Sequence, residues 1–315
     1  MADGDLISDI FKTLRVSGEV YFCARLAGPI CVEIPQSYRH IRFHIVLSGQ
    51  CWLCLNDAEP LLMQKGDIVL VPEGQAQEIS TEPDLASHPL MDAIAGGALK
   101  DGQLSLGSGV QRAQLLCGFL QFDEQIEHPI LSLLPSHMHL SDKTLSADPW
   151  LQSALHLISL EARHPGQGMA AIVTRLIEVI FIQAIRQRIE LANDTSEGFL
   201  LALSDRSISR VLSAMHDTPD QKWSVEGLAD IAGQSRSAFA RKFAEQVGTS
   251  PMDYLRRWRL SKARLLLVSS QLSMGEIAFQ CGYDCVPSFS RSFKREFHIG
   301  PGTFRKNGGS STVPR

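Results

Sequence analysis

The feature that most constrains this sequence is a segment that occurs twice in its C-terminal third. The first copy reads LADIAGQSRSAFARKFAEQVGTSPMDY, and the second reads IAFQCGYDCVPSFSRSFKREFHIGPGTF. The copies align at an offset of 49 residues and, after one inserted residue, at an offset of 50, where Arg241 matches Arg291. Matches at nearly constant spacing predict two copies of one structural unit.

Each copy has the parts of a helix-turn-helix motif. A short apolar helix, expected at residues 225–232 and again at 274–281, ends at a glycine, which tolerates the left-handed conformation that stops a helix. A second helix then begins near Ser235 or Pro287, residues that suit a helix N-terminus. Phenylalanines four residues apart mark its buried face in both copies: Phe239 and Phe243, and Phe289 and Phe293.

The opposite face of each second helix is left for solvent or for a partner. On one isolated helix such arginines would be read as a solvated face, but arginine at the same place in two copies favours a binding surface. The candidate DNA-binding residues are Arg236, Ser237, Ala240, Arg241 and Lys242 in the first copy, and Val286, Ser290, Arg291, Lys294 and Arg295 in the second.

One continuous helix is predicted to join the copies. Residues 251–268 begin with a proline and contain no further Gly or Pro, so this helix spans about 27 Å. Adjacent major grooves on one face of DNA lie about 34 Å apart, so a stiff connector of this length can present two recognition helices to neighbouring grooves.

The packed face of this connecting helix is predicted to hold Tyr254, Trp258, Leu265 and Val268. Its cations are open to phosphate contact or plain solvation: Arg256, Arg257, Arg259, Lys262 and Arg264.

Charge is divided unevenly along the 315 residues. Residues 205–315 carry 17 Lys and Arg against 10 Asp and Glu, whereas residues 1–204 carry 13 against 24; +7 and −11 give the net charge of −4. Only the C-terminal third therefore suits a polyanion such as DNA.

The acidic N-terminus lacks a secretory signal, charges interrupt the most apolar helix, and seven cysteines stand at irregular spacing. These features predict a cytoplasmic protein with no membrane association.

The N-terminal part changes to short, alternating apolar runs. After a short helix expected within residues 1–20, the candidate strands are 20–26, 30–34, 43–48, 51–55, 60–63, 68–71, 76–80 and 114–122. Many short strands at such spacing predict a barrel or a sandwich. Residues 86–109, which hold five glycines and few large apolar residues, are predicted to be a mobile loop or a lid over the barrel mouth.

Two helices are predicted to follow the strands, at residues 149–164 and 169–191, with a Pro- and Gly-containing turn between them. The second carries a wide apolar stripe: Ile172, Leu176, Val179, Ile180, Gln183 and Ile185. This stripe fits either packing against the barrel or a dimer interface. Residues 193–197 lack any apolar period and are predicted to be a linker.

A candidate effector pocket lies in the strand region and is formed by His44, Cys51, Gln77 and Cys117. The CxxC of Cys51 and Cys54 is a poor metal site, because strand residues three apart point to opposite faces. Three interpretations of His44, Cys51 and Cys117 stay open: ordinary core residues, a zinc or other metal site, and a redox-sensing thiol. No cofactor is assigned, and zinc is the metal that such a site would favour.

The C-terminal region resembles the DNA-binding domain of AraC/XylS-type transcription regulators. The resemblance rests on the paired motif and on the SP and GP signatures at Ser250-Pro251 and Gly300-Pro301. It implies that residues early in each second helix read base edges: Ser237, Ala240 and Arg241, and Val286, Ser290 and Arg291. It also implies a transcription activator that binds promoter DNA and works with RNA polymerase, although the residues themselves leave repression open.

The N-terminal region resembles the cupin-like sensor domain of one subgroup of these regulators. The segments FHIVLSGQCWLCL, GDIVLVPEGQAQ and LLCGFLQF carry this resemblance over roughly residues 20–190. It implies a small-molecule or metal effector, and it favours a homodimer formed through the helical pair. Metal-binding cupins usually have histidine where this sequence has Gln77, and a neutral amide is a weak transition-metal ligand.

The predicted fold is α+β multidomain. It comprises a cupin-like β-barrel domain at residues 1–147, a helical dimerisation or coupling segment at 148–192, a linker at 193–204 and an all-α double helix-turn-helix domain at 205–315. No P-loop, HExxH or GxSxG motif is present, so an enzyme is not predicted. Two alternatives remain open: a metal-dependent cupin enzyme with a DNA-binding tail, and a thiol-based redox or repair protein.

Overall fold

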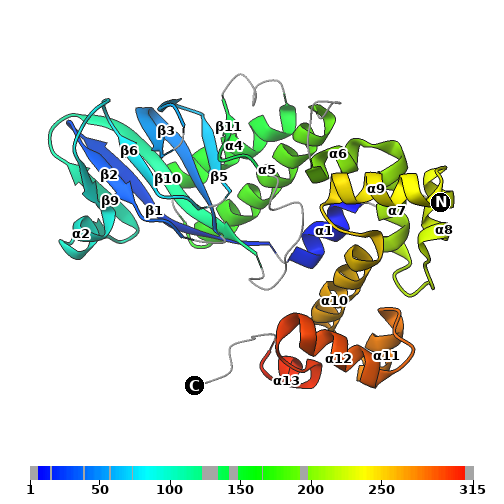
Figure 1. Ribbon diagram of the computed structural model, residues 1–315. Coiled ribbons are helices and arrows are strands. Elements are labelled where there is room, and N and C mark those ends of the chain that lie inside the picture. Colours follow the sequence, from blue (N-terminus) through cyan, green and yellow to red (C-terminus); the bar gives the residue numbers. More distant parts are fainter. Residues whose placement is uncertain are drawn as a thin grey trace. The chain divides into compact units, whose positions relative to one another are not determined.

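A computed structural model describes residues 6–14, 16–37, 40–56, 58–72, 74–122, 134–141, 148–164, 166–191 and 198–308. The chain forms two compact units (Figure 1). The first, here called the barrel unit, contains residues 16–124 and 134–187. The second, the helical unit, contains residues 1–15, 125–133 and 188–315. Among the described residues, no helix is both long and apolar enough to cross a membrane.

The barrel unit is built from strands of two sheets that share one long strand, β3. The strands are β1 Ser17–Ala27, β2 Cys31–Ile34, β3 His40–Leu55, β4 Leu61–Gln64, β5 Ile68–Val71, β6 Gln77–Ser80, β7 Ser87–Pro89, β8 Leu99–Lys100, β9 Gln103–Gly107, β10 Gln111–Gln121 and β11 Met138–Leu140. One sheet contains β11, β5, β3, β10, β1, β9 and β8, and the other contains β4, β3, β6, β2 and β7. The predicted cupin-like barrel is confirmed.

Strand β3 replaces the two separate strands predicted at 43–48 and 51–55. Its first half pairs with β10 and β5, and its second half pairs with β4 and β6. Between the halves Gly49 has φ +73°, a conformation that glycine adopts without strain. A Cβ at this position would collide with the carbonyl oxygen of Arg112. The glycine therefore bends a continuous strand from one sheet into the other, where a turn had been expected.

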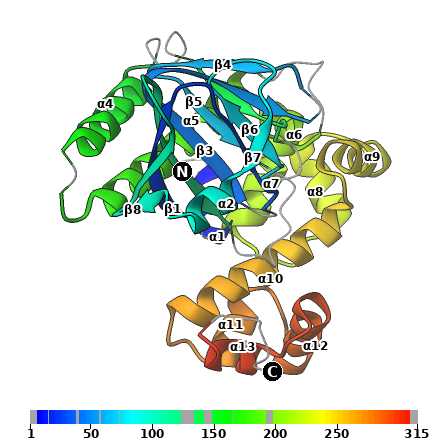
Figure 2. The ribbon, with the colours of Figure 1, turned by 90° about the vertical axis from the view of Figure 1, so that its left-hand side faces the viewer.

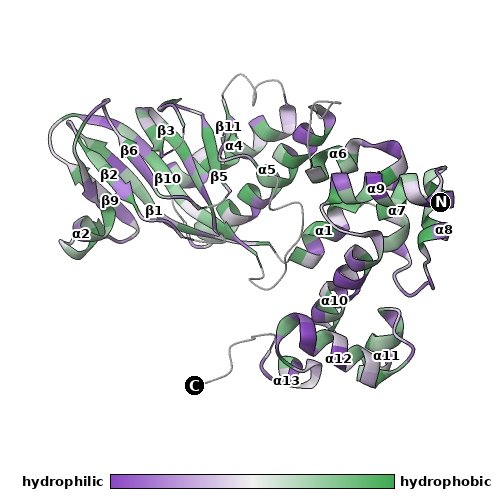
Figure 3. Ribbon diagram, viewed as in Figure 1, coloured by the Kyte–Doolittle hydropathy of each residue, from purple (hydrophilic) through white to green (hydrophobic). Residues whose placement is uncertain are grey.

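An aliphatic core fills the space between the two sheets. Strands of both sheets contribute buried side chains to it, among them Ala24, Val32, Val46, Leu53 and Ile79. The strand alternation that directs these side chains inward also directs their neighbours to the outer faces. Figure 3 shows this mixture of hydrophobic and hydrophilic positions along the strands.

The segment 86–109 forms a helix and strands, so the predicted loop is wrong, whereas the predicted lid stays a prediction. It forms β7, a short helix α2 (Leu90–Ala95) and the hairpin of β8 and β9. Gly102, with φ +72°, stands in the turn between β8 and β9, whereas Leu104 and Leu106 are buried. Strand β9 pairs in parallel with β1, and α2 packs beside β2 against one end of the core. A few buried leucines are enough to fix a segment that glycine content marked as loose.

Two helices follow the barrel strands at the predicted places, α4 (Pro149–Arg163) and α5 (Met169–Leu191). Val173, Ile177 and Phe181 of α5 are fully buried. Thr174 Oγ1 donates a hydrogen bond to the carbonyl of Gly18 in β1 at 3.4 Å. Helices α4 and α5 therefore lie along the outer face of the sheet that contains β1 and β10 (Figure 2).

The helical unit contains α1 Leu6–Leu14, α6 Gly198–Ser204, α7 Arg206–Asp217, α8 Val225–Ala232, α9 Arg236–Val247, α10 Pro251–Ser269, α11 Met274–Gln280, α12 Val286–Phe297 and α13 Pro301–Lys306. Helix α1, which the sequence placed with the barrel, contacts α7 and α10 and buries Ile10 and Leu14 completely. Helix α6 lies within the predicted linker 193–204 and packs on α9; residues 193–197 lie outside the described residues.

The paired motif is present in the predicted form. Helices α8 and α9 make the first copy, and α11 and α12 the second. Serine side chains cap three of these helices: Ser224, Ser235 and Ser273 each accept a backbone N–H of the first turn. Gly233 ends α8 with φ +68°. The phenylalanines Phe239, Phe243, Phe289 and Phe293 are all fully buried, as their spacing predicted.

Helix α10 packs through two different faces, which corrects the predicted stripe. Tyr254 and Trp258 are buried with the first copy, but Leu265 and Val268 are only half-buried. Leu260, Ala263 and Leu267 are buried instead, in the core of the second copy. A helix that serves two small cores has no single apolar stripe, so its periodicity misleads in the second half.

Gly118→Ala tests the packing between β10 and its neighbours. A Cβ at this position would overlap the carbonyl oxygen of Glu19 and the ring of Phe43, so we expect the free energy of unfolding to fall by about 1–3 kcal/mol. Urea unfolding followed by the fluorescence of the four tryptophans measures this change. Gly166→Ala is the control, because no atom lies within 4 Å of its added Cβ. Equal stability of the two variants would contradict the packing described here.

Candidate DNA interface and barrel pocket

The recognition face of α9 is exposed but carries ion pairs. Arg236 pairs with Glu226 at 3.0 Å, and Arg241 lies 3.9 Å from Glu245. Ser237 is exposed, and Ala240 is half-buried. The arginine pairs are largely solvent-exposed, and surface pairs of this kind contribute about 0–1 kcal/mol each. They can therefore be exchanged for contacts to DNA at little cost.

Lys242, also predicted to face DNA, is instead held against α7. Its Nζ lies 2.6 Å from a carboxylate oxygen of Asp205 and 3.2 Å from the hydroxyl of Ser207. Asp205 also caps α7, and its hydrogen bonds hold its pKa well below the usual range even though partial burial acts in the opposite direction. The lysine therefore joins the first motif to the preceding helix.

The recognition face of α12 carries three exposed cations. Arg291, Lys294 and Arg295 form no ion pair with any residue that the structure describes. Val286 is half-buried against the core of the second copy, and Ser290 is half-buried. A row of unpaired cations on an exposed helix attracts phosphate oxygens without first having to break an ion pair.

Three arginines of α10 bind the protein itself. Arg256 pairs with Asp253 and, at 2.6 Å, with Glu296 of α12. Arg259 donates to the carbonyl oxygens of Pro219 and Gln221, at 2.6 and 2.8 Å, in the segment before α8. The sequence left these cations open to phosphate contact, because partners 38 to 40 residues away cannot be read from spacing.

Arg264 is the third of these arginines and is buried in the second copy. Its guanidinium carbon lies 4.7 Å from the ring centre of Phe297 and 4.6 Å from that of Phe304. On the side of the first copy, His216 stacks on Trp258 and hydrogen-bonds to the hydroxyl of Tyr254 at 2.9 Å. Polar and aromatic contacts thus fasten α10 to both motifs. Figure 1 shows α10 running from α9 to the second motif.

Three of the four predicted pocket residues meet inside the barrel. His44 lies between Cys117 and Gln77: its Nδ1 is 3.3 Å from Cys117 Sγ, and its Nε2 is 3.2 Å from Gln77 Oε1. All three side chains are buried. Strand pairing places them together, since His44 is directly opposite Cys117 in the β3–β10 register.

The protonation states of this chain of contacts follow from burial. Burial lowers the pKa of His44 to about 4, opposed by its hydrogen bond to Gln77 and assisted by the nearby charge of Arg42. Burial also raises the pKa of the Cys117 thiol. The neutral imidazole therefore donates from Nε2 to the Gln77 oxygen and accepts the thiol proton at Nδ1. Gln77 Nε2 then has no hydrogen-bond partner among the described residues.

Cys51 stays in the apolar core beside this group. Burial, with a contribution from the charge of Asp67, raises the pKa of the Cys51 thiol to about 12. Within the part of the chain that the structure describes, no group of three or more His, Cys, Asp or Glu residues is placed to hold a metal ion. One imidazole, one thiol and an amide do not make the donor set that zinc requires.

A small apolar cavity of about 20 Å³ adjoins Cys117. Of this lining, sequence reasoning selected only Cys117, because the other side chains resemble those of any strand core. The lining residues are Phe22, Ala24, Leu26, Val32, Ile34, Ile79, Leu90, Leu104, Leu106, Leu115 and Cys117.

Comparisons with known proteins agree with this architecture. A family model described as a cupin matches residues 5–190, and one described as a helix-turn-helix domain matches residues 228–307. The chain is 32% identical over 308 residues to the HTH-type transcriptional regulator AlkR of Acinetobacter baylyi, covering 96% of this chain and 99% of that protein. It is 29% identical over 304 residues to a putative AraC-like transcription regulator of Streptomyces lividans, covering 96% and 98%.

Among solved structures, the DNA-binding domain of AdpA in complex with a target DNA is 29% identical; the match covers 33% of this chain and 93% of that domain, with a TM-score of 0.31. With a cupin domain followed by a paired helix-turn-helix domain, and with regulators matching along nearly its whole length, the chain belongs to the AraC-type family of DNA-binding transcription regulators.

Proposed function

We propose that the regulator reads two successive major-groove segments of promoter DNA with α9 and α12. The observation that carries this proposal is the pair of motifs with exposed recognition faces on one continuous helix. Helix α10 has 19 residues, or about 28 Å, and is fastened to both motifs by buried contacts. One chain would therefore engage two grooves without needing a palindromic site.

The residues proposed to read bases are those early on each recognition face. In α9 they are Ser237, Ala240 and Arg241, and in α12 they are Val286, Ser290 and Arg291. Arginine recognises guanine through two hydrogen bonds, while alanine and valine contact only the thymine methyl group or the groove surface. Lys294 and Arg295, further along α12, would contact phosphates and contribute to affinity for any sequence.

Substituting the two base-reading arginines tests this assignment. We expect Arg291→Ala and Arg241→Ala each to weaken binding to the cognate promoter by about 1–3 kcal/mol. Fluorescence anisotropy at one fixed salt concentration measures the affinity, on a promoter first identified by mapping bound sites in cells. Arg210→Ala is the control, because this exposed arginine lies on α7. Wild-type affinity in both test variants would refute the base-reading roles.

We also propose that the cupin barrel binds the effector, and that this effector is largely apolar with a hydrogen-bond acceptor at one end. The aliphatic lining favours the apolar part. Among the described residues, the buried Gln77 Nε2 has no acceptor, and an unpaired buried amide costs about 1–3 kcal/mol. Arg42, two residues before His44 on β3, likewise has two buried nitrogens, Nε and Nη1, with no partner in the part of the chain that the structure describes.

The cavity of about 20 Å³ is too small for such a molecule, so binding requires side chains to move. Helix α2 is the element whose movement would open the cavity, because α2 covers one end of the core with Leu90 and Ile94. Displacing α2 would expose the aliphatic lining. The effector would then favour one arrangement of the chain over the other and so alter DNA binding.

Gln77→Leu tests the position of the effector. We expect 2-octanone or octanoate to raise the melting temperature of the full-length wild type more than octane does, and we expect this advantage to disappear in the variant. Gln121→Leu is the control, because Gln121 is an exposed glutamine at the end of β10 and lines neither cavity. If Gln77→Leu keeps the wild-type preference, the acceptor does not bind at Gln77.

We further propose that α5 forms the interface of a homodimer. Part of the predicted stripe packs inward, since Ile180 and Ile185 are fully buried. The remaining residues, Ile172, Leu176, Val179 and Gln183, recur at intervals of four, three and four residues and so share an outward face. Ile172 and Val179 are both 44% exposed. DNA-bound dimers of this kind would contact RNA polymerase as an activator does.

Charged residues in this outward stripe test the dimer. We expect the Ile172→Glu, Val179→Glu double variant to sediment as a monomer at concentrations where the wild type is a dimer. In a symmetric dimer, the two new carboxylates of one protomer would be buried close to the same two carboxylates of its partner, and like charges in a buried interface repel. Val110→Glu is the control, since Val110 is 78% exposed on the same unit. A wild type that is monomeric, or a double variant that stays dimeric, would rule out this interface.

A further inference from the structure

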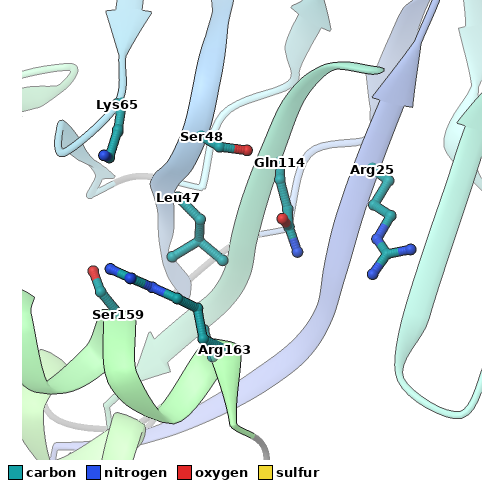
Figure 4. A pocket seen from close by; sticks show the side chains of 8 residues that line it. Arg25, Leu47, Ser48, Lys65, Gln114, Ser159 and Arg163 are labelled. Carbon is teal, nitrogen blue, oxygen red and sulfur yellow. The ribbon is translucent and has the colours of Figure 1, made fainter. Parts of the chain in front are cut away.

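A second cavity lies on the other face of the sheet from the apolar core, between the strands and α4. Its volume is about 410 Å³, within the range of small-molecule sites. Figure 4 shows the residues that line it: Arg25, Leu47, Ser48, Lys65, Gln114, Ser159, Ala162 and Arg163. They come from β1, β3, β10, the turn before β5 and the last turns of α4, all within the barrel unit.

The charges around this cavity are all positive. Arg25, Lys65 and Arg163 line it, and no carboxylate does. None of the three forms an ion pair with a described residue, although this unit belongs to the acidic part of the chain. In Figure 4 the Arg163 side chain extends below Leu47 toward the Lys65 side, and Arg25 stands on the other side of Gln114. The three cations are exposed, and an anion bound among them would be attracted by all three.

Neutral donors complete the lining. The hydroxyls of Ser48 and Ser159 and the amide of Gln114 face the same cavity. Gln114 Nε2 already donates to Cys23 Sγ at 3.1 Å, which fixes the orientation of the amide and leaves its second hydrogen for another acceptor. Arginine and lysine beside hydroxyl and amide donors form a donor set suited to carboxylate or phosphate oxygens.

We infer that this cavity is a second ligand site and binds a small organic oxyanion, a dicarboxylate or a phosphate monoester. The site differs from the barrel pocket in position and in chemistry, since alternate residues of β10 face the two: Cys117 the barrel interior and Gln114 this cavity. A bound anion would connect Arg25 of β1 with Arg163, the last residue of α4, and so fasten α4 to the sheet. The inference depends on neither the barrel effector nor the base-reading residues.

The experiment is a calorimetric titration of the full-length protein at constant ionic strength with inorganic phosphate, glycerol 3-phosphate, succinate and uncharged glycerol. We expect saturable one-to-one binding of at least one of the three anions and none of glycerol; whether phosphate or carboxylate binds better identifies the head group. We expect Arg25→Gln, Lys65→Gln and Arg163→Gln each to weaken that binding about tenfold or more, as for the loss of a charged hydrogen bond.

Arg175→Gln is the matched control, because Arg175 is exposed on α5 and paired with Glu178 at 2.8 Å. It should bind the anion like the wild type, and unchanged melting curves of the glutamine variants would exclude misfolding. The inference is overturned if none of the anions binds saturably, or if all four variants bind equally well. It is also overturned if Arg163→Gln weakens promoter binding without changing anion binding, because the cations would then contact the DNA backbone.

Discussion

The attachment of α10 to both helix-turn-helix motifs is the constraint on which DNA recognition in this regulator depends. Neither motif buries enough surface to hold its recognition helix rigidly alone, because each is only two short helices. The buried faces of α10 supply the missing core for both, through Trp258 on one side and Leu260 and Leu267 on the other. Arg256 and Arg259 add directional contacts that fix the rotation of each motif about α10. Spacing and orientation of the two reading surfaces are thus set by one element.

The two motifs share a plan but differ in the state of their charges. The arginines of α9 are engaged by glutamates, whereas the cations of α12 are unpaired among the described residues. Exposed ion pairs are weak and screened by salt, so the difference changes the relative affinity of the motifs more than their capacity to bind. Under the proposed binding mode, α12 would have the stronger attraction to DNA at a distance, and α9 would contribute after contact, when its arginines exchange carboxylates for bases or phosphates.

The sequence predicted the helices of the paired motif almost to the residue, because caps, glycine stops and phenylalanine spacing are local signals. It also selected His44, Gln77 and Cys117, which meet inside the barrel. It failed where long-range contacts decide the outcome. Strand β3 continues through Gly49 because two sheets meet there, and Leu104 and Leu106 order a glycine-rich segment by pairing with β1. The role of Arg259 stayed open between phosphate contact and plain solvation, since its acceptors in the segment before α8 are distant in sequence.

The same reasoning explains why one sheet can carry two chemically opposite sites. Side chains alternate across a strand, so β10 places Leu115 and Cys117 toward the aliphatic core and Gln114 toward the cationic cavity. A ligand on one face must act on the strands that form the other face, and β1 contributes to both, through Ala24 inside and Arg25 outside. Helix α4 lies over the cationic face, and α2 closes the apolar one. If ligands bind both proposed sites, we expect a signal from either to reach the rest of the chain through displacement of a helix, because the hydrogen-bonded strands between the sites resist deformation.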